Sequence, residues 1–463
     1  MEGKKVKNAW LKYDEKDLKE VNEFSKRYKD FITNCKTERE CTTSIISVAE
    51  KNGYVDLNET LKENKRIKSG DKLYINNMGK AVALFVIGEE PLTSGMNIIG
   101  SHLDSPRSDL KQNPLYEEGD FALFKTHYYG GIKKYQWVTT PLAIHGVVVQ
   151  KNGEKINVVI GENEDDPVFC FTDLLAHLSS TQMKKKASEV IEGENLNLLA
   201  GSIPCEVEKD KYSVKDKVLN IIREKYGIDE EDFISSEFEV VPAGPSRDLG
   251  IDSSMIIGYG HDDRVCAYTS FEAIIDMQDH KKTLVNLMVD KEEIGSVGAT
   301  SMGSAFFENA VAEIINNMED YNDIKLRRAF SNSKMLSADV NAAFDPTFPD
   351  VFEKANSAYF GKGVIFTKYT GVGGKAGSND ANAEFIAEIR RIMDENNISF
   401  QTAELGKVDQ GGGGTIAYIL AALNMQVLDA GVPVLSMHSP CEVISKVDLF
   451  ETYKAFKAFY QEA

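Results

Sequence analysis

Three acidic residues follow directly after an apolar run in the segment 284–296, LVNLMVDKEEIGS. Asp290, Glu292 and Glu293 come where a buried strand should end. Carboxylates this close raise one another's pKa unless a proton or a cation lies between them, so the spacing is typical of an acid/base pair or of a metal site. The alternative is a solvated acidic turn that opens a helix, because Asp and Glu favour helix N-termini.

Four more apolar runs also end at potential metal ligands. Their ends carry His102 and Asp104, Asp262 and Asp263, Asp339, and His438. The carboxyl ends of neighbouring parallel strands meet at one crevice, so we expect these side chains to converge. Histidine and carboxylate ligands suit zinc above all, with cobalt or manganese as substitutes. Two such ions joined by a bridging carboxylate would activate a water, and a carboxylate outside the coordination sphere would act as general base.

The segments that carry these ligands alternate between strand and helix patterns. Short apolar strands occur between residues 72 and 104, and strands alternate with helices after residue 254. This predicts an α/β fold with a mostly parallel sheet flanked by helices. Residues 105–253 are more β-rich and polar, with a helix expected at 171–180. We therefore predict a catalytic domain in two parts, 1–104 and 254–463, and an inserted domain at 105–253.

Composition narrows the function classes. The 463 residues carry a formal net charge of −19, from 72 acidic and 53 basic residues. Because this charge repels nucleic acid and anionic membrane surfaces, we expect neither as a partner. Six cysteines without a CxxC pair favour reduced thiols in a cytoplasm over a disulfide framework or a thiolate zinc site. The N-terminus lacks an apolar leader segment, and no run reaches the ~18 apolar residues of a membrane span.

The motifs GSHLDSP, HDDR, DKEEIGS, SADV and SMHS resemble those of the M18 aminopeptidases, the aspartyl aminopeptidase family. Their order, and the insertion after the first motif, extend the resemblance over nearly the whole chain. The resemblance implies a di-zinc site in which Asp262 bridges both ions. His102 and Asp339 would complete the protein ligands of one ion. Glu293 and His438 would complete those of the other.

The resemblance also implies the roles of three further residues. Glu292 would deprotonate the attacking water and later protonate the leaving amine, and Asp104 would orient His102. In the resembled family, a histidine of the inserted domain reaches the active site of a neighbouring subunit, and His177 matches its position. A surface histidine on a helix is the alternative for His177. The resemblance thus implies a dimerisation domain at 105–253 and a homo-oligomer built from dimers, up to a dodecamer.

The residues on either side of Asp262 bear on its metal-binding role. Asp263 stands where the resembled family usually has Asn, and His261 precedes the bridging position. A histidine beside two acids could compete for the metal. The alternative is a hydrogen-bonded neighbour of the site.

Two glycine-rich segments could suggest a nucleotide site. The segment 371–379 has Ala376 where a phosphate-binding loop needs Ser or Thr, and the segment 411–414 lacks the GxGxxG spacing. Both patterns therefore argue against phosphate binding. The segment with Gly412 precedes a helix, where backbone N–H groups can receive a substrate oxygen. Ser378 matches a family segment near the substrate pocket, or it caps a turn and a helix.

The peptide substrate remains partly open. The resemblance suggests a preference for N-terminal Asp or Glu, and some relatives favour neutral residues. So acidic a chain would need a local cation to hold an acidic side chain, and Lys368 and Lys375 are the candidates. The alternative functions are a co-catalytic zinc carboxypeptidase or N-acyl amide hydrolase, and a non-catalytic assembly protein that retains the fold. The intact ligand set and Glu292 argue against the last.

Overall fold

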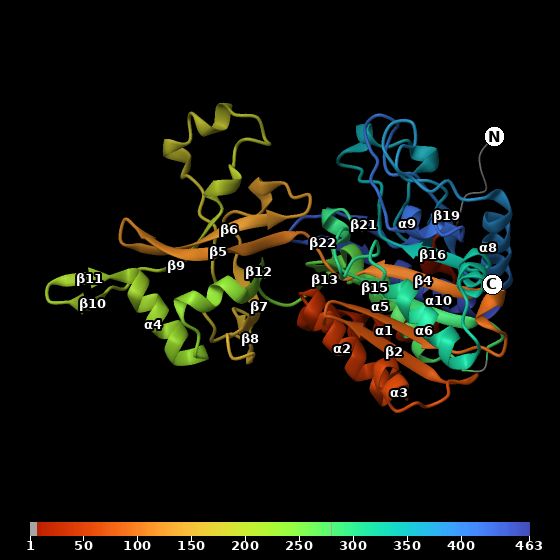
Figure 1. Ribbon diagram of the computed structural model, residues 1–463. Helices are drawn as coiled ribbons and strands as arrows, with labels where there is room; N and C mark the ends of the chain where they lie inside the picture. The colour runs from red at the N-terminus through yellow and green to blue at the C-terminus, as the bar shows by residue number, and fades with distance from the viewer. Residues whose placement is uncertain (1–6, 279) are drawn as a thin grey trace. The chain divides into compact units, whose positions relative to one another are not determined.

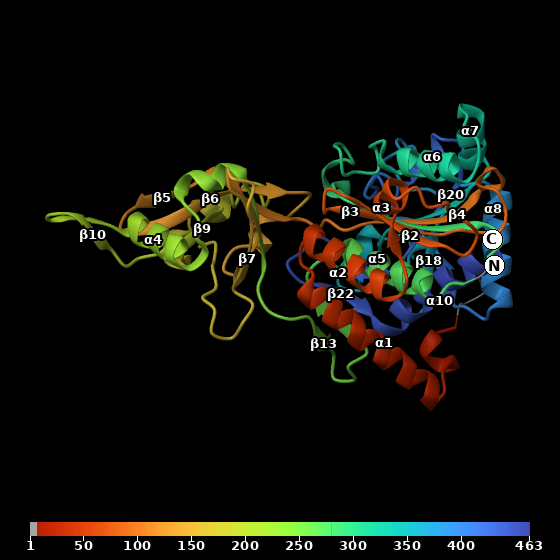
Figure 2. The same ribbon diagram turned by 60° about the horizontal axis from the view of Figure 1, so that its bottom comes forward.

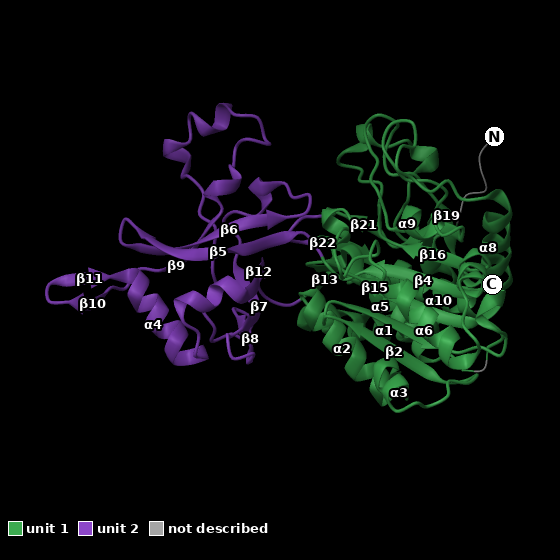
Figure 3. Ribbon diagram, in the orientation of Figure 1, with its two compact units in different colours: residues 1–104, 246–437, 442–463 green, residues 105–245, 438–441 purple. Residues whose placement is uncertain are grey.

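The computed structural model describes residues 7–278 and 280–463, and it divides into two compact units (Figure 3). Unit 1 comprises Met1–Asp104, Ser246–Met437 and Glu442–Ala463. Unit 2 comprises Ser105–Pro245 and His438–Cys441. The segment 246–253, grouped with the insertion on sequence grounds, belongs to unit 1, because β13 (Arg247–Leu249) pairs with β14 (Met255–Gly258). The first six residues of the N-terminal segment lie outside the described residues.

Unit 1 is built on a nine-stranded sheet, as far as residues 7–278 and 280–463 define it. In spatial order its strands are β1 (Val55–Asp56), β2 (Lys72–Asn77), β3 (Ala81–Val86), β15 (Thr283–Val289), β4 (Met96–His102), β16 (Lys334–Ala338), β20 (Gln426–Gly431), β18 (Val364–Thr367) and β19 (Phe400–Thr402). The central strands β15, β4, β16 and β20 run parallel to one another. Every residue of β3, β4 and β15 is buried, as expected for strands covered on both faces.

Helices cover both faces of this sheet (Figures 1 and 2). One face shares an apolar cluster with α1 (Glu15–Asn34), α2 (Glu38–Lys51), α5 (His261–Ile275), α8 (Ala383–Glu395) and α10 (Lys446–Glu462). The other face packs against α3 (Leu57–Lys62), α6 (Phe306–Met318), α7 (Asp323–Ser331) and α9 (Ala417–Ala421). Figure 2 shows α6 and α7 on one side of the strands and α1 and α10 on the other. The predicted α/β fold is confirmed.

A second, five-stranded sheet corrects one sequence-based expectation. It contains β13, β14, β22 (Glu442–Ser445), β21 (Pro433–Leu435) and β17 (Asn341–Ala342). The runs before Asp262 and His438 were expected in the parallel sheet, but they form β14 and β21 of this second sheet, both antiparallel to β22. A short apolar run has the same pattern in either sheet, so sequence alone could not separate them.

Unit 2 is β-rich. Its six-stranded sheet is antiparallel, in the order β8 (Lys155–Ile160), β7 (Leu142–Val149), β12 (Ser236–Pro242), β5 (Arg107–Glu118), β6 (Phe121–Tyr129) and β9 (Asn197–Gly201). The hairpin β10 (Cys205–Glu208) and β11 (Lys211–Ser213) leads into α4 (Val214–Tyr226). The helix predicted at 171–180 is wrong, because only a single 3₁₀ turn, Ala176–Leu178, forms there. Leu174, Leu175 and Leu178 are exposed, so this short segment has no apolar packing to hold a helix.

No helix in the described part of the chain combines the length and the apolar character that a membrane crossing requires.

Candidate metal centre and active site

His102, the last residue of β4, lies among carboxylates that are buried or largely buried. Its Nε2 atom is 3.3 Å from Oδ1 of Asp262, 3.8 Å from Oδ1 of Asp339 and 3.9 Å from Oε2 of Glu292. The imidazole side chain is 1% exposed, so water screens these interactions poorly. One imidazole nitrogen therefore faces three acids that come from separate parts of the chain.

Two overlapping groups of potential metal ligands share this imidazole. In each group the ligand atoms lie within 4.8 Å of one another, and the groups are His102, Asp263 and Asp339, and His102, Asp262 and Glu293. Nitrogen and carboxylate donors at this spacing suit zinc or a similar divalent ion. Oδ1 of Asp263 is buried and makes no hydrogen bond within the described residues, so this oxygen is also suited to bind such an ion.

The strand register explains why His102 and Asp339 lie close together. Val289 of β15 pairs with His102 of β4, and Ser337 of β16 pairs with Gly100. Parallel neighbours in this register end at nearly the same level, so the residues that follow them, including Asp339, gather at one edge. Asp262 and Asp263 come from the second sheet, because its strand β14 leads into the first turn of α5. Both residues have non-helical backbone dihedrals there.

Asp104 fixes both the imidazole and the acidic turn. Nδ1 of His102 lies 3.0 Å from the backbone oxygen of Asp104, which can only accept a hydrogen bond. Nδ1 therefore carries the proton, and Nε2 is free to bind a metal. The Asp104 carboxylate accepts hydrogen bonds from the backbone N–H groups of Glu292 and Glu293, at 3.2 and 3.1 Å. Asp104 thus connects the end of β4 to the turn that carries the acidic pair.

The acids perturb one another strongly. Burial, together with the charges of Asp339, Asp262 and Asp104, raises the pKa of Glu292 to about 8, although His102 opposes this shift. Burial lowers the pKa of His102, but its contacts with Asp104, Asp262 and Asp339 outweigh burial and hold it well above the usual value. An excess of buried negative charge of this kind is relieved by protons or by bound cations.

Asp263 and His261 differ in their surroundings. Burial and then the charge of Asp339 raise the pKa of Asp263 well above its usual value. His261 is fully buried, and its Nδ1 lies 2.6 Å from the hydroxyl of Tyr28. Burial lowers the pKa of His261 to about 3. His261 belongs to neither ligand group, and its geometry fits the hydrogen-bonded neighbour.

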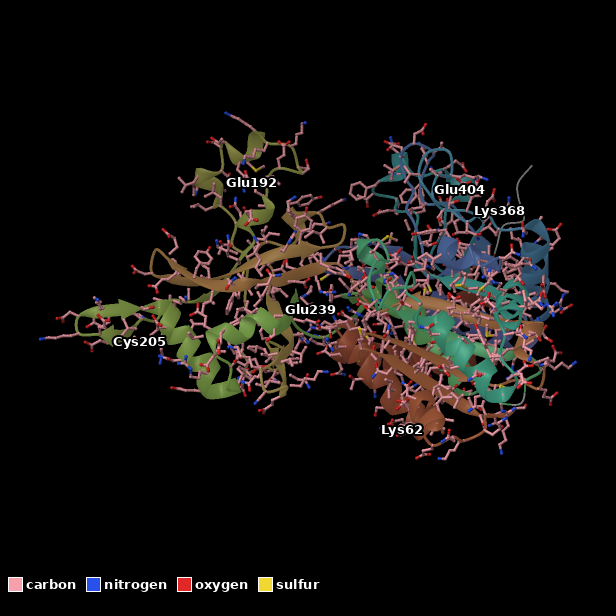
Figure 4. The ribbon with its side chains drawn as sticks, viewed as in Figure 1. Lys62, Glu192, Cys205, Glu239, Lys368 and Glu404 are labelled. Carbon is pink, nitrogen blue, oxygen red and sulfur yellow. The ribbon has the colours of Figure 1, made fainter. Side chains whose placement is uncertain are left out.

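The lysines expected to bind substrate lie on loops of unit 1. The Nζ atoms of Lys368 and Lys375 lie 3.1 and 3.0 Å from the two oxygens of Asp380. Nζ of Lys375 is also 3.7 Å from the centre of the Tyr369 ring, and the Tyr369 hydroxyl donates to Glu404 at 2.6 Å. Figure 4 labels Lys368 and Glu404 in this loop region.

The glycine-rich segments face one another across a pocket of about 200 Å³. The pocket is lined by residues of the segments 369–375 and 404–412, including Lys375 and Gly412. The backbone N–H of Gly371 donates to the oxygen of Gly413 at 2.7 Å, which joins the two segments. Ser378 lies at the end of the first segment, where its N–H donates to the oxygen of Lys375 at 3.3 Å.

Comparison with known proteins decides the family. The model of the family described as "Aminopeptidase I zinc metalloprotease (M18)" matches residues 31–460. The chain belongs to the M18 family. It is therefore a zinc-family aminopeptidase, a hydrolase of the exopeptidase class, and the description names neither carboxypeptidases nor amide hydrolases. As an enzyme it is also distinct from the non-catalytic assembly protein considered above.

Known M18 proteins are similar to this chain in sequence and in structure over nearly its full length. It is 59% identical over 456 residues to a protein of Clostridium acetobutylicum named "Probable M18 family aminopeptidase 1", which covers 98% of both chains. The crystal structure of aminopeptidase I from that organism matches with a TM-score of 0.91 and 57% identity, covering 99% of this chain and 100% of that one. An M18 aminopeptidase structure from Thermotoga maritima gives 0.94 and 42%, with complete coverage of both. The mApe1 dodecamer of S. cerevisiae, at 20% identity and a TM-score of 0.77, covers 96% of this chain and 97% of that one and shares the fold.

Two histidines of the M18 pattern lie in unit 2. His438 belongs to this unit by its contacts, and its Nδ1 is 2.9 Å from the backbone oxygen of Gly131. It is not part of the two ligand groups found within the described residues. His177 is exposed, in the 3₁₀ turn Ala176–Leu178. The metal role of His438 and the catalytic role of His177 stay predictions.

Two buried acids of this M18 chain were not predicted from the sequence. Glu442, 1% exposed, accepts the backbone N–H of Asp262 at 3.0 Å and so helps to place that ligand. Asp429, 3% exposed, lies within the largely buried strand β20 and accepts the hydroxyl of Thr415 at 2.7 Å. The signal for Asp429 was present, because an acid in the middle of a buried strand needs a dedicated partner.

Proposed function

We propose that this M18 chain is a di-zinc aminopeptidase that releases N-terminal residues from peptides. Asp262 would bridge the ions, with His102 and Asp339 on one and Glu293 and His438 on the other. The observation that carries the proposal is that four of the proposed ligands, His102, Asp262, Glu293 and Asp339, all belong to the two ligand groups, each with its ligand atoms within 4.8 Å. Cobalt or manganese are the substitutes that the same donors would accept.

Glu292 is the proposed general base. Divalent ions held by these ligands would lower the pKa of a water and polarise the scissile carbonyl. The carboxylate of Glu292 would take the proton of the attacking water and deliver it to the leaving amine. Its place on the 3₁₀ turn Glu292–Ile294, held by the hydrogen bonds to Asp104, supports this role, because a base must keep a fixed distance from the water.

We propose a preference for N-terminal Asp or Glu, with neutral residues also accepted. Lys375 lines the pocket between the two glycine-rich segments, and a cation there would attract an acidic side chain. Asp380 already pairs with both Lys375 and Lys368, so the group keeps a single net positive charge. The preference should therefore be moderate.

We further propose a cytoplasmic homo-oligomer that assembles through unit 2, which would act as a dimerisation domain. Several large apolar side chains around His177 are exposed, namely Leu174 (45%), Leu175 (53%), Leu178 (65%) and Met183 (72%). Apolar surface of this kind is typical of an interface. The S. cerevisiae structure is a dodecamer, which supports a homo-oligomer. His177 would then complete the active site of a neighbouring subunit.

The activity is tested with a panel of aminoacyl chromogenic substrates, run after chelation with added zinc, cobalt or manganese. We expect hydrolysis that depends on the added metal and no hydrolysis of N-acyl amino acids. Mass photometry of the same preparation tests the assembly. A monomer that retains full activity would contradict the proposed role of His177, without affecting the proposal for the metal centre.

A further inference from the structure

Thr415 connects the glycine-rich segment 411–414 to the central sheet. Its hydroxyl donates to Oδ1 of Asp429 on β20 at 2.7 Å, and it accepts the backbone N–H of Ala417 at 3.3 Å. The second bond is made with the first residue of α9, one position beyond the N-cap residue Ile416. The first bond crosses from a loop to a strand that is buried in the core, and Asp429 itself is 3% exposed. A hydroxyl that bonds a buried carboxylate is held more firmly than one that bonds water.

Asp429 lies between the two strands that lead to the functional regions of unit 1. On one side it pairs with Ser337 of β16, the strand that precedes the metal-ligand candidate Asp339. On the other side it pairs with Thr367 of β18, the residue before Lys368. The anchor point of the segment 411–414 is therefore part of the same strand framework that carries Asp339.

The segment 411–414 in turn supports the segment 371–375. The N–H of Gly371 donates to the oxygen of Gly413, and a Cβ atom on Gly412 would lie 2.0 Å from the oxygen of Gly371. Such a contact is possible only for glycine, because any side chain would overlap the facing backbone. The two segments therefore pack backbone against backbone, and a displacement of one displaces the other. Lys375 lies on the second segment, in the wall of the 200 Å³ pocket.

We propose that the hydrogen bond between Thr415 and Asp429 is the anchor that sets the width of this pocket, and that the pocket receives the side chain of the substrate's N-terminal residue. Thr415 and Asp429 are then positioning residues for substrate selection. The inference rests on the proposed aminopeptidase function, which supplies the substrate. It adds the physical link from the strand beside Asp339, through Thr415 and Gly412, to Lys375.

The test compares Thr415→Val with Thr415→Ser in the full-length, zinc-loaded enzyme. Valine has the shape of threonine without the hydroxyl, whereas serine keeps it. For Thr415→Val we expect KM to rise at least fivefold, kcat to change less than twofold, and the ratio between acidic and neutral N-terminal substrates to fall. Thr415→Ser keeps the hydroxyl, and Asp429→Asn keeps an oxygen that can accept its hydrogen bond. Each of these two variants should therefore retain the wild-type selectivity.

A role in stability alone would give a different pattern. Asn322, which lines neither the pocket nor the metal centre, caps α7 by accepting the N–H of Lys325 at 3.0 Å. Asn322→Ala should lower the melting temperature and leave KM and selectivity unchanged. If Thr415→Val does the same, or if it matches Thr415→Ser in every kinetic parameter, the inference is overturned. A wild-type enzyme that hydrolyses no aminoacyl substrate would instead refute the proposed function.

Discussion

Two groups of ionisable side chains in unit 1 contrast in burial and in charge balance. Around His102, the acids Asp262, Asp339 and Glu292 face one imidazole, and burial with mutual repulsion raises the pKa of Glu292 to about 8. Around Asp380, one carboxylate lies between two lysines. Hydrogen bonds from Lys375 and then Lys368 lower the pKa of Asp380, and its side chain is 48% exposed.

The contrast shows which group needs a ligand. The group at Asp380 is exposed to water, which screens its single net positive charge, so it is stable as it stands. The group at His102 holds more acids than its single imidazole can neutralise, in a place where water cannot screen them. Its folded form is therefore favoured by cations or by protons. Strong perturbation in a buried group of ligands indicates a functional site, whereas satisfied exposed pairs do not.

The largest expected effect is on catalysis by the buried group. Glu292→Gln removes the proposed base but keeps the size of the side chain, so we expect kcat to fall about 10³-fold. Zinc content should stay at the wild-type value, because Glu292 is the acid outside the two ligand groups. Steady-state kinetics with metal analysis measures both. Glu308→Gln, at an exposed position of α6, is the matched control. Full activity in Glu292→Gln would remove this residue from its role.

The second prediction concerns stability and pH. Glu292 has a pKa of about 8 when folded, against a usual value of 4.5. Between these values the folded form holds a proton that the unfolded form has released, so the free energy of unfolding of the metal-free protein falls as pH rises from about 4.5 to 8. His102, with a raised pKa, acts in the same direction. Bound zinc favours the ionised acids and removes this slope.

Thermal melts of chelated and zinc-loaded protein at pH 6 and pH 8 provide the measurement. We expect zinc to stabilise the protein by about 2 kcal/mol more at pH 8 than at pH 6, since a pKa unit corresponds to about 1.4 kcal/mol. Asp448, whose pKa burial raises to about 7, is not among the candidate ligands and contributes equally to both samples. If stability changes with pH equally in the chelated and the zinc-loaded protein, the acids around His102 do not bind the cation.

Sequence patterns predicted the local part of this site well. The apolar runs that form β4 and β15 end at His102 and Asp290, as expected from burial on both faces. The structure brings four of the five proposed metal ligands, all except His438, into the two groups at His102. Strand ends are predictable because the change from apolar to acidic residues is a local signal.

Features that depend on distant contacts could not be predicted. The run before Asp262 forms a strand of the second sheet, and only its pairing with β22 distinguishes it from a strand of the main sheet. Glu442 carries no motif, and its partner, the N–H of Asp262, lies 180 residues away in sequence. Asp429 is visible as an acid within a buried strand, but only the structure identifies the hydroxyl of Thr415 as its partner. The segment 171–180 has the residues of a helix but no apolar surface to cover, so its tertiary setting overrides its propensity.

The smallest expected effect comes from the exposed group. Lys375→Met removes a cation from the pocket wall, and we expect kcat/KM for an N-terminal Asp substrate to fall about threefold, because exposed ion pairs contribute at most about 1 kcal/mol. Asp380→Asn frees both lysines from their carboxylate, so the same ratio should rise by a similar factor. An N-terminal Leu substrate is the control, since it carries no charge for the lysine to attract. If both variants change kcat/KM equally for the Asp and Leu substrates, Lys375 affects the shape of the pocket and not its charge selectivity. The acidic preference must then come from another part of the site.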